Sequence, residues 1–244
     1  CLSSIIIPNN VTSIGKSVFE NCTSLIEINI PKSITTICEY AFYGCSSLSS
    51  IIIPDSVIDI WECAFKNCIS LSTIDIPNSV KLIRPGVFWG CSNLKSVSLP
   101  DNLQSINESL FADCSSCVSI TIPSTVTHIY NSAFKYCKSL SSIELPDGVI
   151  ELYPYAFQGC SNLLSIILPK SVNYIRNFAF ADCSNLKTII VPEIFIIEIG
   201  AFDNCKELTD FYCYSFNVPT TWCNFDGSYI EYATLHVPES SIEL

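Results

Sequence analysis

Apolar residues recur with a period of 23 residues along most of this chain. Each unit follows the pattern L-x-x-I-x-I-P-x-x-V-x-x-I-x-x-x-A-F-x-x-C. The period is plainest in three columns of identical residues, which run from Pro8 to Pro192, from Phe19 to Phe202 and from Cys22 to Cys205. The period is broken once, by a deletion of one residue between Pro192 and Phe202. Repetition at a fixed period of this length indicates a solenoid of stacked units.

The spacing inside each unit predicts short strands and tight turns. Apolar residues alternate in the I-x-I step, as at Ile28 and Ile30, and such alternation predicts a strand with one buried face. The following proline ends the strand because it has no N–H donor for the ladder. The V-x-x-I step allows a second short strand, and A-F-x-x-C has helix-like or 3₁₀-like spacing. We therefore expect a parallel sheet on one face of the coil, with short strands, 3₁₀ turns or helical turns on the other.

The period also divides the chain into two parts. Residues 1–210 predict a solenoid of about nine to ten units, none of which could bury its apolar face alone. Residues 211–244 depart from the period but keep several aromatic side chains. Because a terminal unit needs an atypical neighbour to cover its core face, we expect this segment to be a C-terminal cap.

The repeated motif resembles the BspA-like family of leucine-rich repeats, found in surface proteins of anaerobic bacteria and some protists. The I-x-I-P strands, the 23-residue period and closers such as Ala133-Phe134 to Cys137 carry the resemblance over residues 1 to about 212. Residues 233–238 look like the closing segment of such proteins from Bacteroides-type bacteria. The resemblance implies a right-handed leucine-rich-repeat coil that is extracellular or on the cell surface, with its signal and anchor outside this chain. It also implies protein partners, including host matrix and cell-surface proteins.

Composition argues against several other classes of function. The formal net charge of −11 disfavours nucleic acid and anionic membrane surfaces as partners, because both require basic faces. No apolar run is long enough for membrane insertion by this segment. His128 and His236 lie far apart in the sequence, and no catalytic, phosphate-binding or metal-ligand motif occurs. We therefore expect a protein that is not an enzyme and uses no cofactor and no metal.

Fifteen cysteines suggest disulfides or metal sites, but their spacing favours packing. Nine of them form the repeated column from Cys22 to Cys205, where a free thiol acts as a small apolar group. Cys117 stands where other units have leucine. We expect Cys38 and Cys63 to be exposed, since their columns vary between units. A disulfide between Cys213 and Cys223 in the tail is left as an open alternative.

Candidate binding residues are those that escape the repeat. On the outward strand positions they are Ile52, Asp75, Glu144, Ile167 and Tyr212, and we expect Asp75 and Glu144 to lie on strands. A second outward strand column is a stripe of serine and threonine. In the turns, aromatic candidates gather at Trp61, Tyr130, Tyr153, Tyr155 and Phe178.

Tyr130, Tyr153, Tyr155 and Phe178 come from three consecutive units and are expected to form one patch. Clustered exposed aromatic residues mark interaction sites, although they could also simply cover the edge of the coil. The sequence thus favours a non-catalytic surface or secreted protein that mediates protein binding or adhesion. The alternative is a structural spacer that displays another domain outside this chain.

Overall fold

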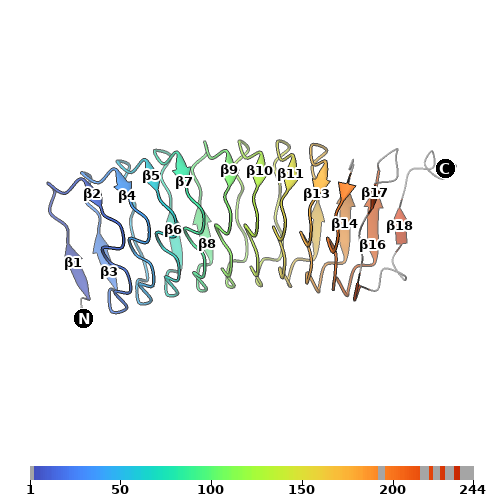
Figure 1. Cartoon of the computed structure of the whole chain (residues 1–244), viewed down its shortest axis with the longest axis horizontal. Coiled ribbons are helices and arrows are strands. Elements are labelled where there is room, and N and C mark those ends of the chain that lie inside the picture. The colour runs from blue at the N-terminus through green and yellow to red at the C-terminus, as the bar shows by residue number, and fades with distance from the viewer. Residues whose placement is uncertain (1–2, 192–195, 215–219, 222–225, 229–233, 237–244) are drawn as a thin grey trace.

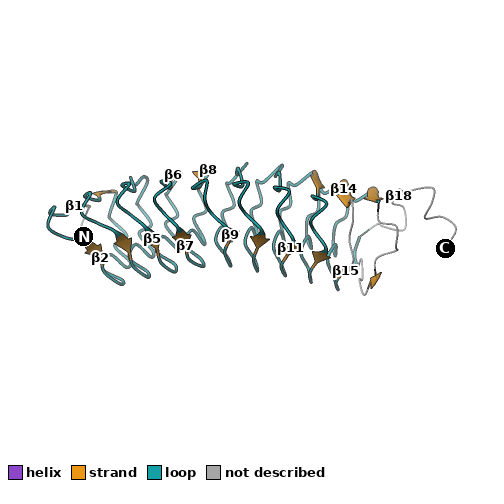
Figure 2. Ribbon diagram, turned by 90° about the horizontal axis from the view of Figure 1, so that it is seen from above, coloured by secondary structure: helices purple, strands orange, loops and turns teal. Residues whose placement is uncertain are grey.

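The computed structural model describes residues 3–191, 196–214, 220–221, 226–228 and 234–236. Each repeat unit forms one coil, and the coils stack side by side along a single long axis, with strands β1 (Ser4–Ile6) and β18 (Thr234–His236) near opposite ends of the stack (Figure 1). A view turned by 90° shows the same regular succession of coils (Figure 2). The solenoid expected from the repeat is therefore confirmed.

One face of the solenoid carries the longer strands, which the I-x-I step forms as expected. We call these strands the long-strand ladder, and neighbouring members pair in parallel with a register of one unit, so that Ile74 lies beside Val97. The ladder is interrupted at residues 50–53, where Ile52 forms only an isolated bridge with Asn29, and at residues 119–122 and 142–145, which form no strand. The strands are β1 (Ser4–Ile6), β3 (Glu27–Asn29), β6 (Thr73–Asp75), β8 (Ser96–Ser98), β12 (Ser165–Ile167), β14 (Thr188–Val191), β16 (Asp210–Cys213) and β18 (Thr234–His236).

A second ladder of two-residue strands, here called the short-strand ladder, follows the V-x-x-I step. Its members also pair in parallel, and they fall into one group of four and one of six strands. Between the groups, Asn107 Nδ2 donates to the carbonyl of Ile83 at 2.6 Å. The strands are β2 (Ser13–Ile14), β4 (Thr36–Ile37), β5 (Asp59–Ile60), β7 (Leu82–Ile83), β9 (Ser105–Ile106), β10 (His128–Ile129), β11 (Glu151–Leu152), β13 (Tyr174–Ile175), β15 (Ile196–Ile197) and β17 (Thr220–Thr221).

Stacked phenylalanine rings run through the core from Phe19 to Phe202. Successive ring centroids lie 5.2 to 5.9 Å apart, and their planes differ by 1° to 15°. Such aromatic pairs contribute about 0.5–1.5 kcal/mol each beyond the area they bury. Because each ring touches the ring of the next coil, this stabilisation exists only when coils stack.

The cysteine column beside these rings consists of free thiols, and eight of its nine members are buried. Each buried thiol also donates a hydrogen bond across the coil boundary. Cys68 Sγ donates to the Phe42 carbonyl at 3.1 Å, and the other members repeat this contact at 3.0 to 3.2 Å. The column therefore satisfies backbone acceptors as well as filling the core, which a purely apolar residue of that size could not do.

The A-F-x-x-C step forms hydrogen-bonded turns, and the described residues contain no helix. Positive φ angles recur in two columns of these turns, as at Ser17 (56°) and Asn21 (56°) in the first coil. The second column contains only Asn, Asp, Gly and one Tyr among the described residues, which fits the tolerance of Asn, Asp and Gly for left-handed backbone. A residue with positive φ is also what a type II turn requires at its third position.

The described part of the tail continues the coil. Strands β15 and β17 pair in the short-strand ladder, and β16 and β18 pair in the long-strand ladder. Ser228 takes the place of the column cysteine, because its Oγ donates to the Phe202 carbonyl at 2.6 Å and accepts from Cys205 N at 2.9 Å. Most of the expected cap, including Cys223, lies outside the described residues. Cys213 is free and buried.

Two expectations about side-chain placement were wrong. Cys63, expected to be exposed, is 6% exposed. Its φ of 55° and the absence of a side chain at Gly86 let its thiol lie against the next coil. Glu144, expected on a strand, lies at residues 142–145, where the long-strand ladder is interrupted.

Substituting Gly90 by alanine should destabilise the solenoid. The φ of Gly90 is 75°, and an added Cβ would collide with Asn67 Oδ1 of the preceding coil. The left-handed backbone alone costs a residue with a Cβ about 1–2 kcal/mol. In urea denaturation, Gly90→Ala should lower the free energy of unfolding by more than this amount, because the collision adds to the backbone cost. In an Asn67→Gly background, which removes the colliding side chain, the decrease should fall towards about 1–2 kcal/mol.

The matched control is Gly15→Ala, since Gly15 has no positive φ and no atom lies within 4 Å of a Cβ built there. Equal losses for Gly90→Ala and Gly15→Ala would contradict this account of the turns.

Candidate binding surface

Three rings meet on the outward side of the short-strand ladder, and we call them the outward cluster: His128, Tyr130 and Tyr153. The ring centroids of Tyr130 and Tyr153 lie 4.8 Å apart at an interplanar angle of 51°. His128 lies 5.7 Å from Tyr130 and 6.3 Å from Tyr153. All three residues are half-buried. Burial, together with the charge of Glu151 and the neighbouring Tyr130, raises the pKa of Tyr153 above its usual value, which keeps its hydroxyl neutral.

An ion network borders the outward cluster. Arg176 Nε donates to Glu151 Oε1 at 2.5 Å, and Arg176 Nη1 donates to Glu198 Oε1 at 2.6 Å. The second Glu198 oxygen accepts from Asn177 N at 3.1 Å, and the guanidinium lies 4.7 Å from the Tyr174 ring centroid. The hydrogen bonds to Glu151 and Glu198 raise the pKa of Arg176 further above its usual value. Both carboxylates are thus held by one cation within the surface.

Tyr155 and Phe178 form a separate stack at the turns. Their ring centroids lie 5.4 Å apart with an interplanar angle of 6°, and Lys135 Nζ lies 5.0 Å from the Tyr155 ring. The Phe178 ring occupies the space that a Cβ on Gly200 would need. Among the described residues, no ring contact links this stack to the Tyr130–Tyr153 pair. The four aromatic residues expected in one patch therefore form two pairs.

Trp61 directly follows β5 of the short-strand ladder, in an earlier coil than the outward cluster. Its side chain is 38% exposed, and the Arg84 guanidinium lies 5.4 Å from its ring. A second exposed tryptophan, Trp89, donates from Nε1 to Asp113 Oδ2 at 3.0 Å and has Lys66 Nζ 3.3 Å from its ring. The Trp89 ring is therefore held by contacts within the chain.

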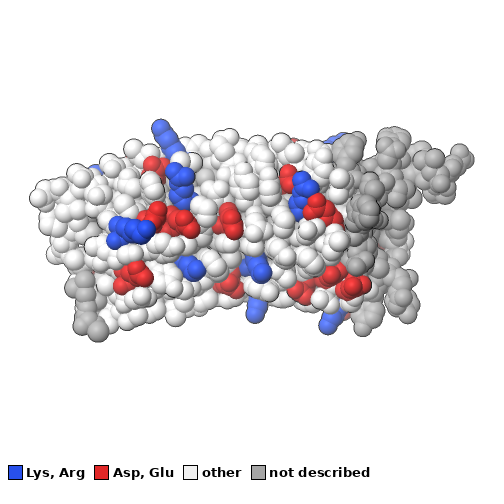
Figure 3. Space-filling model, in the orientation of Figure 1, with Lys and Arg blue, Asp and Glu red and all other residues white. Residues whose placement is uncertain are grey.

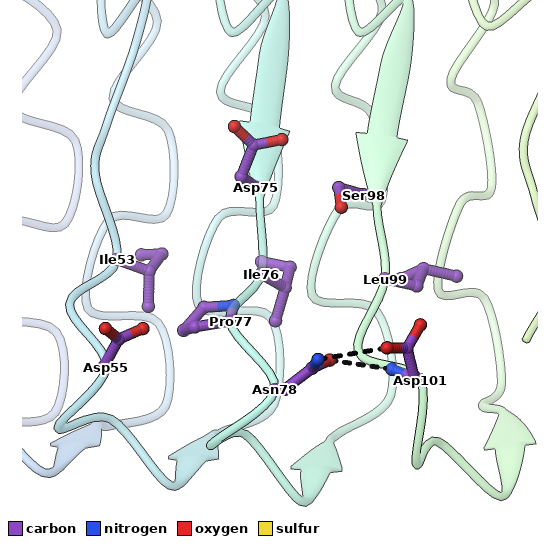
Figure 4. A pocket seen from close by; sticks show the side chains of 9 residues that line it. All are labelled: Ile53, Asp55, Asp75, Ile76, Pro77, Asn78, Ser98, Leu99 and Asp101. Atoms are coloured by element: carbon purple, nitrogen blue, oxygen red, sulfur yellow. Dashed lines mark hydrogen bonds between the residues drawn. The ribbon is translucent and has the colours of Figure 1, made fainter.

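The long-strand ladder exposes its candidate side chains singly. Ile52 is 81% exposed and Ile167 is 64% exposed, while Asp75 and Glu144 are exposed as well. Figure 4 shows Asp75 beside a hollow of about 370 Å³, where Asn78 and Asp101 close one rim through two hydrogen bonds at 3.1 and 2.9 Å. Similar open hollows adjoin Ile52 and Glu144. These hollows lie along a sheet face rather than inside the molecule.

Tyr212 sits at the C-terminal end of the long-strand ladder, next to His236 of β18. Their rings stack with centroids 4.0 Å apart, and His236 Nε2 lies 3.2 Å from Asp210 Oδ1. The hydrogen bond from His236 lowers the pKa of Asp210. Tyr212 is therefore half-covered by a neighbour that sequence spacing did not reveal.

Charges are mixed over the surface drawn in Figure 3, where lysines and arginines lie among acidic side chains. No group of three or more metal-ligating side chains occurs among the described residues. The same part of the chain contains no helix that is long and apolar enough to cross a membrane.

The family model for the BspA type leucine-rich repeat region matches residues 1–117 and 81–209. The chain belongs to the BspA-type leucine-rich repeat family. No curated protein matches it. A leucine-rich repeat protein from Bacteroides ovatus has a similar solved structure, with a TM-score of 0.86 and 30% identity over 98% of this chain and 61% of that one. The chain thus spans less than two thirds of the length of that relative.

Two further solved structures share the fold of this BspA-type protein. The leucine-rich repeat protein of T. pallidum has a TM-score of 0.53 and 25% identity, over 84% of this chain and 78% of that one. The pneumococcal vaccine antigen PcpA has a TM-score of 0.68 and 21% identity, over 98% of this chain and 72% of that one.

Sequence spacing missed His128 of the outward cluster and the neighbouring pair of Tyr174 and Arg176. His128 and Tyr174 occupy one outward column of the short-strand ladder, two residues before the column of Tyr130 and Arg176. Treating both sides of the V-x-x-I strand as outward columns would have placed these four side chains together. The ion pairing of Arg176 across three coils had no signal in the motif, because Glu151 and Glu198 come from different columns.

Removing the Arg176 side chain charge should destabilise this part of the BspA-type solenoid. Arg176→Met leaves Glu151 and Glu198 without their cation, and charged hydrogen bonds of this kind contribute about 1.5–3 kcal/mol. Urea denaturation should show that the free energy of unfolding falls by an amount of that order.

The control is Lys16→Met, which breaks the exposed pair of Lys16 with Glu39 and should leave the unfolding midpoint unchanged. A loss as large at Lys16 as at Arg176 would show that the bridging geometry is unimportant.

Proposed function

We propose that this chain is a non-catalytic binding protein, secreted or displayed at a cell surface, that attaches to protein partners. The observation that carries the proposal is the outward cluster, in which His128, Tyr130 and Tyr153 gather on the short-strand ladder. Tyrosine is among the residues that most often dominate binding energy at interfaces. Membership of the BspA-type family also supports a role in protein interaction.

The buried free thiols are compatible with a location outside the cell. Burial raises the pKa of Cys91 and of Cys205 to about 12, so the reactive thiolate is scarce in the folded protein. Since the thiolate is the form that reacts, buried protonated thiols resist oxidation without forming disulfides. The packed core thus tolerates surroundings that would oxidise exposed cysteines.

The other candidate residues take secondary places in this proposal. Ile52, Asp75, Glu144 and Ile167 would extend a contact along the long-strand ladder, while Trp61 would extend one along the short-strand ladder. Tyr155, Phe178 and Tyr212 are covered by stacking neighbours, so we propose that they shape the surface. Residues after 210 would cap the solenoid. The spacer alternative predicts that none of these side chains affects attachment.

The experiment is a binding screen of the purified chain against matrix and cell-surface proteins, followed by the double variant Tyr130→Ala/Tyr153→Ala. Attachment should fall by about tenfold or more, since truncating an interface hot spot costs about 2 kcal/mol or more. The matched control is Tyr214→Ala, which removes an exposed tyrosine from the long-strand side.

Unchanged attachment of the double variant, with its fold intact by circular dichroism, would refute a role for the outward cluster. Absence of any protein ligand in the screen would favour the structural spacer.

A further inference from the structure

The outward cluster continues as a row of rings over successive coils. His128 and Tyr174 occupy one column two coils apart, with Glu151 between them, and Tyr130 and Tyr153 occupy the neighbouring column in the first two of these coils. Neighbouring strands in a sheet lie about 4.8 Å apart, so rings two coils apart are separated by about 9.6 Å along the solenoid. The His128 and Tyr174 rings therefore offer two contacts at this spacing to an extended partner.

The polar atoms of this row are free to serve a partner. Within the described residues, the hydroxyls of Tyr130, Tyr153 and Tyr174 take part in no hydrogen bond. His128 Nδ1 lies 2.8 Å from Thr127 Oγ1, which leaves Nε2 as its other polar atom. The hydroxyls can donate to carbonyl oxygens, and the tilt of 51° between Tyr130 and Tyr153 keeps one ring from covering the other.

Charge narrows the kind of partner. Arg176 is already bound by two carboxylates, so the border of the row has no unpaired cation to attract an anionic partner. The carboxylates of Glu151 and Glu198 are in turn paired with Arg176, so they are not free to bind a cationic partner. The row is thus suited to an uncharged segment that supplies apolar surface and carbonyl acceptors.

We propose that the row of His128, Tyr130, Tyr153 and Tyr174 binds a proline-rich segment of a protein partner in the polyproline II conformation, an inference that rests on the proposed binding function. Aromatic surfaces recognise such segments because the conformation is already formed before binding. Its turn rises about 9.3 Å over three residues, close to the spacing of two coils, and its carbonyls have no internal hydrogen bonds. Prolines three residues apart would contact His128 and Tyr174, which share one column two coils apart, with Tyr130 and Tyr153 beside them in the neighbouring column.

The test uses a labelled synthetic peptide of repeated Ala-Pro-Pro triplets and a control peptide of equal length with glycine in place of proline. Fluorescence anisotropy with the full chain should show binding of the first peptide only, with an affinity that changes little between low and high salt. Tyr130→Ala/Tyr153→Ala should weaken it about tenfold or more, and Tyr130→Phe/Tyr153→Phe should weaken it less. Tyr214→Ala should bind as the parent chain does.

Several outcomes would overturn the proposal. They are equal binding of both peptides, binding that Tyr130→Ala/Tyr153→Ala does not weaken, and binding of a neutral oligosaccharide without binding of the proline-rich peptide. If the peptide fails while a protein ligand from the screen still depends on Tyr130 and Tyr153, this inference falls and the proposed binding function stands. If that dependence is also absent, both fall.

Discussion

The carbonyl of each core phenylalanine accepts two hydrogen bonds, and one of them comes from the next coil. The Phe42 carbonyl, for example, accepts from Cys45 N of its own turn at 3.1 Å and from Cys68 Sγ of the following coil at 3.1 Å. The Phe42 ring at the same time stacks on the rings of both neighbouring coils. A single coil can satisfy neither requirement, which is why the units are stable only as a stack.

Much of this could be predicted from the sequence, because stacking constraints repeat every 23 residues and leave a periodic record. The I-x-I strands, the buried phenylalanines and the free thiol column followed from spacing alone. The thiol-to-carbonyl bonds did not, since nothing in a column of cysteines distinguishes packing from hydrogen bonding. Cys63 was placed wrongly because its burial depends on Gly86 in the next coil, a relation between two different residue types in one column.

The candidate site was only partly predictable for a related reason. Tyr130 and Tyr153 lie in one column of adjacent coils, so spacing was enough to bring them together. Tyr155 and Phe178 also share a column, but whether their rings joined the first pair depended on the turn geometry between the columns. The bridge of Arg176 to Glu151 and Glu198 spans three coils and was invisible to a motif built from one. Side chains that differ between coils therefore form the candidate binding surface, while those that recur determine the fold.

The most direct test of the account is the reactivity of the column thiols as the pH rises. Burial raises the pKa of Cys91 from 9.0 to about 12, so the folded state favours the protonated thiol. This stabilisation is complete below about pH 9 and is lost as the pH rises towards 12, because the unfolded chain ionises first. A thiol reagent is expected to modify the eight buried thiols of the column only at the rate of global unfolding, and the free energy of unfolding is expected to fall over this interval. Rapid modification of these eight thiols in the folded protein, or a constant free energy of unfolding over the interval, would contradict the stacked core described above.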